Sequence, residues 1–133
     1  MRILLVEDHK ATREEMRALI ERQADMTVVA EAESGEIALD KAREACPDVV
    51  IMDILLPGMN GIETTRKILV NQPGIKVLAL SNHFGDSLVH SILNAGGMGY
   101  VRKNRAFEEL IPALRSVAAG KAYISNGSAG KKP

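Results

Sequence analysis

Five short aliphatic runs recur along the chain at similar intervals, and they limit the possible folds more than any other feature. They span residues 3–6, 26–30, 49–52, 75–80 and 100–101. The runs lack the apolar and polar alternation of a half-exposed antiparallel sheet, so they predict parallel strands covered on both faces. Parallel strands need long crossover connections, which are usually helices.

The segments between the runs have the spacing of amphipathic helices. Their apolar stripes include Met16, Leu19 and Ile20 in the first segment and Leu110, Leu114 and Val117 in the last. We therefore predict the α/β class, with a doubly wound five-stranded parallel sheet in a (βα)5 flavodoxin-like three-layer sandwich. Pro112 falls inside the last stripe, where it predicts a kink or a late helix start.

Length and composition fit one soluble domain of 133 residues, with 46% hydrophobic and 26% charged residues. Seventeen Lys and Arg balance seventeen Asp and Glu, so no net charge attracts nucleic acid or an anionic membrane. No apolar stretch is long enough to cross a bilayer and no signal peptide is evident, which predicts a cytoplasmic protein without membrane contact. The single cysteine, Cys46, is expected as a small buried residue.

Polar side chains stand where the expected strands end. Glu7 and Asp8 follow the first strand, Asp53 the third, Ser81 the fourth and Lys103 the fifth. Because ligands of an open parallel sheet bind beyond the carboxyl ends of its strands, we expect these side chains to converge there.

Three carboxylates in one small site repel each other and need a cation. Oxygen ligands favour a hard ion, so we expect Mg2+ held by Glu7, Asp8 and Asp53. A carboxylate can form an acyl phosphate when metal, lysine and hydroxyl groups neutralise the transferring group, which makes Asp53 the expected phosphoacceptor, assisted by Lys103 and Ser81. The three histidines, His9, His83 and His90, are scattered and are expected at the surface or in packing.

These residues lie in segments 5–9, 53–61, 80–81 and 99–103, which together resemble the response-regulator receiver (CheY-like) family over residues 1–120. The resemblance implies that Asp53 accepts phosphate from a sensor histidine kinase in two-component signal transduction. It further implies that the backbone carbonyl of Leu55 completes the metal ligands, and that Ser81 and Tyr100 move together as a switch. Activity is expected to be limited to self-catalysed phosphorylation and slow autodephosphorylation.

Within that family, the chain looks most like the NarL/FixJ/LuxR-type transcriptional regulators, which carry a helix-turn-helix DNA-binding domain. We expect a receiver domain over residues 1–120 and a linker or tail over 121–133, polar and glycine-rich at its end. DNA contact would then come only through a missing C-terminal helix-turn-helix domain. A stand-alone receiver that acts through protein contacts is the alternative, and a homodimer is possible in either case.

Two further points bear on this interpretation. A Mg2+-dependent aspartyl phosphatase of the haloacid-dehalogenase type is a weaker alternative, because it would need an Asp-x-Asp pair after the first strand, where this chain has Glu7-Asp8. Many receivers have proline after the lysine in a cis peptide, but Asn104 follows Lys103 here, so we expect a trans peptide bond.

Overall fold

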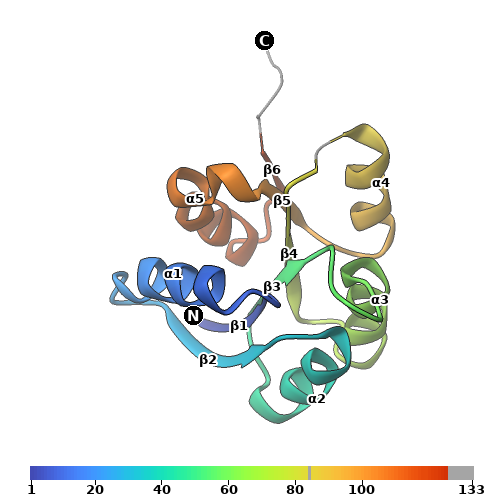
Figure 1. Ribbon diagram of the computed structural model, residues 1–133, viewed down its shortest axis with the longest axis horizontal. Helices are drawn as coiled ribbons and strands as arrows, with labels where there is room; N and C mark the ends of the chain where they lie inside the picture. Colours follow the sequence, from blue (N-terminus) through green and yellow to red (C-terminus); the bar gives the residue numbers. More distant parts are fainter. Residues whose placement is uncertain (84, 126–133) are drawn as a thin grey trace.

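The computed structural model describes residues 1–83 and 85–125, and in it the strands form one parallel sheet in the order β2-β1-β3-β4-β5-β6 (Figure 1). The strands are β1 (Arg2–Val6), β2 (Thr27–Ala32), β3 (Val49–Asp53), β4 (Lys76–Ser81), β5 (Gly99–Arg102) and β6 (Tyr123–Ile124). The order reverses between β1 and β3, as it does in a doubly wound fold. The predicted α/β class and sandwich architecture are confirmed.

Helices cover both faces of the sheet, with α1 and α5 on one side and α2, α3 and α4 on the other (Figure 1). They are α1 (Lys10–Glu21), α2 (Gly35–Ala45), α3 (Gly61–Asn71), α4 (Asp86–Asn94) and α5 (Ala106–Ala118), with a 3-10 turn, η1 (Lys103–Arg105), before α5. Among the residues described, no helix is long and apolar enough to cross a membrane.

The two faces of β3 explain why the aliphatic runs do not alternate with polar residues. Val49 and Ile51 pack into the core under α1 and α5, whereas Val50 and Met52 pack into the core under α2 and α3. All four side chains are fully buried. The body of an inner parallel strand is therefore apolar at consecutive positions, which is the pattern that the sequence shows over residues 49–52.

Within residues 1–83 and 85–125 the sheet contains six strands, so the predicted count of five is wrong. The sixth, β6, pairs in parallel with β5 through Gly99–Tyr123 and Tyr100–Ile124. Two residues are too few to show a strand pattern in a sequence. The domain boundary at residue 120 stays a prediction, and residues 126–133 of the predicted tail lie outside the described residues.

A buried carboxylate holds β6 against α5. Glu109 Oε1 accepts hydrogen bonds from Tyr123 Oη at 3.1 Å and from Ser125 Oγ at 2.9 Å. Arg105 Nε lies 3.1 Å from the other carboxylate oxygen of Glu109. These side-chain contacts join the short strand to the rest of the domain and supplement its few backbone hydrogen bonds.

Helix α5 runs through Pro112, so the predicted late helix start is wrong; a kink remains a prediction. Pro112 is exposed. Water can therefore hydrogen-bond the carbonyl of Glu108, which loses its usual donor at residue 112. The apolar stripe of α5 remains buried and outweighs the local cost of the proline.

Cys46 ends α2 in the left-handed conformation, with φ 48° and ψ 60°, and is exposed. The expectation of a buried cysteine is therefore wrong, because the position serves to reverse the chain before the buried Pro47. Among the described residues, Cys46 is the only non-glycine residue with positive φ. A side chain with a Cβ atom is strained in this conformation.

We expect Cys46→Gly to raise the free energy of unfolding by about 1 kcal/mol, because glycine adopts the left-handed C-cap without steric cost. Urea unfolding monitored by circular dichroism measures this change. Ala119→Gly is the matched control, since Ala119 caps α5 with φ −81° and should lose stability. A loss of stability in Cys46→Gly would contradict the strain argument.

Candidate functional site

The end of β1 brings two acidic side chains to the carboxyl edge of the sheet. The backbone N–H of Glu7 still pairs with the carbonyl of Ala32 at 3.0 Å, and the chain then turns into α1. Glu7 is fully buried, and its Oε2 accepts a hydrogen bond from the His9 backbone N–H at 3.0 Å. The His9 Nδ1 atom lies 3.3 Å from Glu7 Oε2 and 3.4 Å from Asp8 Oδ1.

Lys103 joins this loop to the end of β3. Its Nζ atom lies 2.9 Å from Glu7 Oε1 and 3.0 Å from Asp53 Oδ2. The second oxygen of Asp53 accepts a hydrogen bond from the Leu55 backbone N–H at 3.1 Å. The structure therefore brings together Glu7, Asp53 and Lys103, as their positions at strand ends predicted.

Burial dominates the electrostatics of Asp53. Burial, with a smaller contribution from the charge of Glu7, raises the pKa of this carboxyl from 3.8 to about 6, against the opposing effect of the hydrogen bond from Lys103. Burial alone would lower the pKa of Lys103, but its bonds to Glu7 and Asp53 hold that pKa above its ordinary value. The lysine thus remains charged beside a carboxyl group that gains a proton easily.

The loop of residues 7–9, called the acidic loop below, offers oxygen atoms that fit a divalent cation. The ligand atoms of Glu7, Asp8 and His9 lie within 4.8 Å of one another. Glu7 Oε1 and Asp8 Oδ1 are buried without a hydrogen-bond partner, although Glu7 Oε1 contacts the charged Lys103. Unsatisfied carboxylate oxygens at this edge can ligate a hard ion such as Mg2+. The carbonyl of Leu55 as a further ligand stays a prediction.

Ser81 and Tyr100 lie next to each other, and both contact His83. Ser81 is fully buried, and its hydroxyl accepts a hydrogen bond from the His83 backbone N–H at 3.0 Å. Tyr100 is also fully buried, and its hydroxyl donates to the His83 carbonyl. Burial raises the pKa of Tyr100, although a hydrogen bond with Ser81 opposes this effect. Their roles in phosphoryl binding and switching stay predictions.

Two residues near the acidic loop were not predicted as parts of the site. His9 is exposed like His83 and His90, as expected, yet its ring faces both carboxylates. Arg13 was not singled out, but its Nη1 atom donates to the Glu7 carbonyl at 2.7 Å. The sequence signal that could have identified Arg13 is its position four residues after His9, which places it about one helical turn further along the chain, on the same side of α1.

The sheet, with an acidic pair, an aspartate and a lysine at its carboxyl edge, defines the receiver class of signalling switches. The chain belongs to the response regulator receiver domain family, whose model matches residues 3–115. It is 42% identical over 125 residues to the response regulator GacA of Pseudomonas viridiflava, an alignment that covers 94% of this chain and 58% of GacA. The response regulator UvrY of Escherichia coli is 38% identical over 93% of this chain and 57% of its own length.

Solved structures agree with this assignment. A LuxR-family two-component response regulator from an Aurantimonas species has a TM-score of 0.92 and 40% identity, covering 95% of this chain and 90% of that one. The receiver domain of the putative regulator NarL from Mycobacterium tuberculosis has a TM-score of 0.85 and 28% identity, covering 90% and 97%. The chain is thus a NarL/LuxR-type receiver, and it spans somewhat more than half the length of its curated relatives.

The pKa of Asp53 predicts how the stability of the metal-free protein depends on pH. Because the folded-state pKa of about 6 exceeds the ordinary value of 3.8, the stability that Asp53 contributes is complete below about pH 4. It is lost as pH rises through 6, by at most about 3 kcal/mol. We expect Asp53→Asn to lose this dependence and to be the more stable protein at neutral pH.

Urea unfolding of both proteins in a chelating buffer, at intervals from about pH 4 to about pH 8, tests this expectation. The other carboxylates titrate in both proteins, so the difference between the two unfolding free energies isolates Asp53. That difference should grow with pH in favour of Asp53→Asn. A difference that stays constant over this pH range would contradict a raised pKa for the buried carboxyl of Asp53.

Proposed function

We propose that this receiver accepts a phosphoryl group on Asp53 in a Mg2+-dependent reaction with a phosphohistidine of a sensor histidine kinase. The observation that carries this proposal is the Lys103 ammonium, which bridges the buried carboxylates of Asp53 and Glu7 at 3.0 and 2.9 Å. A buried aspartate held by one cation at a sheet edge is a suitable phosphoacceptor.

The residues of the chain divide the chemical work. An oxygen of Asp53 attacks phosphorus, the bond from phosphorus to the histidine nitrogen of the donor breaks, and an acyl phosphate forms. The Leu55 N–H and the Lys103 ammonium orient the carboxylate before attack. Lys103 can then follow the negative charge onto the phosphoryl oxygens, and Ser81 can donate its hydroxyl proton to another.

Glu7, Asp8, Asp53 and the Leu55 carbonyl would hold the cation. Bound Mg2+ supplies positive charge that offsets the repulsion between the carboxylates and the incoming phosphoryl group. Asp8 Oδ1, which is buried and has no hydrogen-bond partner, supports this assignment. The domain also retains a slow autodephosphorylation in this proposal, which makes it a switch with a limited lifetime.

The switch that reads the acyl phosphate consists of Ser81 and Tyr100. Ser81 moves toward the phosphoryl group, and Tyr100 fills the vacated space. The shared contacts of both side chains with the main chain of His83 support a coupled movement, since displacing one hydroxyl changes the bonding of the other.

The relatives of the chain support a proposal for the output of the whole protein. A LuxR-family response regulator and a transcriptional regulatory protein named DegU, which is 38% identical, are among them. We therefore propose that the receiver controls a helix-turn-helix DNA-binding domain in a longer protein, with homodimer formation as a possible step. Stand-alone signalling through protein contacts is the second candidate.

Phosphorylation of the purified chain by acetyl phosphate tests the proposal. With Mg2+, mass spectrometry should find one added phosphoryl group on the wild type and none on Asp53→Asn. Asp40→Asn is the matched control, because Asp40 is an exposed carboxylate on α2 and its loss should leave labelling unchanged. Labelling of Asp53→Asn at the wild-type level would reject Asp53 as the phosphoacceptor.

A further inference from the structure

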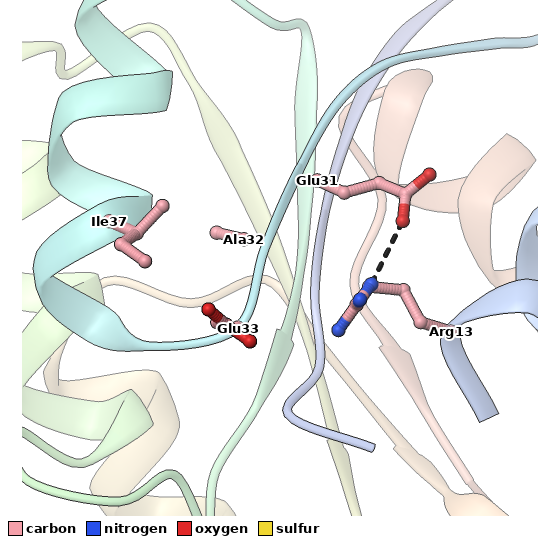
Figure 2. Close-up of a pocket in the computed structure, with 5 residues that line it drawn as sticks. All are labelled: Arg13, Glu31, Ala32, Glu33 and Ile37. Carbon is pink, nitrogen blue, oxygen red and sulfur yellow. Dashed lines mark hydrogen bonds and ion pairs between the residues drawn. The ribbon is translucent and has the colours of Figure 1, made fainter. Parts of the chain in front are cut away.

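Arg13 connects the acidic loop to the neighbouring strand. Its side chain is only 16% exposed and comes from the first turns of α1. Its Nη1 atom donates to the Glu7 carbonyl at 2.7 Å, and its Nε atom donates to Glu31 Oε1 on β2 at 2.9 Å. Figure 2 shows this ion pair beside the hollow that Ala32, Glu33 and Ile37 also line.

The Glu7 carbonyl belongs to the peptide group that leads into Asp8. The N–H of Glu7, directly after β1, bonds to the carbonyl of Ala32 on β2, and the chain then turns into α1. Because a peptide group is planar, fixing its carbonyl also fixes the direction of the bond to the Asp8 backbone. The hydrogen bond from Arg13 therefore restrains the Asp8 Cα atom, from which the carboxylate side chain extends.

Glu31 makes Arg13 suited to this position. An unpaired guanidinium beside the acidic loop would repel a divalent cation, but the carboxylate of Glu31 offsets its charge and sets its orientation. Arg17 also pairs with Glu31, and its described hydrogen bonds go only to Glu31 and Glu21. Two arginines one turn apart on α1 thus share one carboxylate, and only Arg13 reaches the loop.

We propose that Arg13 is a positioning residue, which holds the Glu7–Asp8 peptide in the orientation that binds the divalent cation. The inference rests on the proposed function, since it concerns the same Mg2+ site. Arg13 touches neither the cation nor the phosphoryl group. Its loss should therefore weaken cation binding and leave the phosphoryl transfer rate at saturating Mg2+ nearly unchanged.

Arg13→Lys and the matched control Arg17→Lys separate this role from a general loss of charge pairing. Lysine keeps the positive charge, but its single ammonium group cannot bond the Glu7 carbonyl and Glu31 in the geometry of the guanidinium. We expect Arg13→Lys to raise the Mg2+ dissociation constant about tenfold, and Arg17→Lys to change it less than about twofold. Isothermal titration calorimetry measures both values.

Two more measurements distinguish positioning from simple destabilisation. At saturating Mg2+, labelling of Arg13→Lys by acetyl phosphate should proceed within about twofold of the wild-type rate. In the metal-free proteins, the backbone amide resonances of Asp8 and His9 should shift in Arg13→Lys and stay in place in Arg17→Lys. Thermal unfolding confirms that each variant is folded at the temperature used, and Arg13→Gln replaces Arg13→Lys if it is not.

The outcomes keep the two proposals apart. A wild type that binds no Mg2+ would reject the proposed function itself. A wild type that binds Mg2+, with equal dissociation constants for Arg13→Lys and Arg17→Lys, would reject only the role of Arg13. A slower rate at saturating Mg2+ without a change in the dissociation constant would also reject it, because Arg13 would then act on the transfer step.

Discussion

The ammonium group of Lys103 is the interaction on which the site depends. It lies between two carboxylates that are almost completely buried, Glu7 at the end of β1 and Asp53 at the end of β3. Removing the ammonium would leave two buried carboxylates without their counter-charge, and breaking a buried ion pair in this way typically costs about 3–5 kcal/mol. One lysine therefore joins the ends of β1 and β3 at the edge of the sheet.

The parallel sheet makes this arrangement possible. All its strands end at the same edge, so residues that are about fifty positions apart in the sequence become neighbours without long loops. The apolar side chains of each inner strand anchor it from both faces. The site is consequently built where buried strands of the sheet end.

Much of this was predictable from the sequence because burial on both faces leaves a simple pattern. The strands β1 to β5 and the convergence of Glu7, Asp53 and Lys103 follow from apolar runs and the residues that end them. The trans peptide after Lys103 was also expected and is confirmed, since the described residues contain no cis peptide bond. The strand β6 has only two residues, too few to form a recognisable pattern. The left-handed cap at Cys46 is a backbone conformation, which the periodicity of side chains cannot predict. The hydrogen bond from Arg13 to the Glu7 carbonyl likewise depends on the three-dimensional arrangement of the main chain, which a residue pattern does not reveal.

Strand β5 has hydrogen-bonded neighbours on both sides at Tyr100, with Ala79 of β4 on one and Ile124 of β6 on the other. The backbone carbonyl of Tyr100 accepts a further hydrogen bond from the Ser125 N–H at 2.7 Å. Sliding this strand would break several of these bonds together, whereas turning the phenol ring breaks only those of its hydroxyl. A rotation of the Tyr100 side chain would therefore break fewer hydrogen bonds than a shift of the main chain, which is held on both sides.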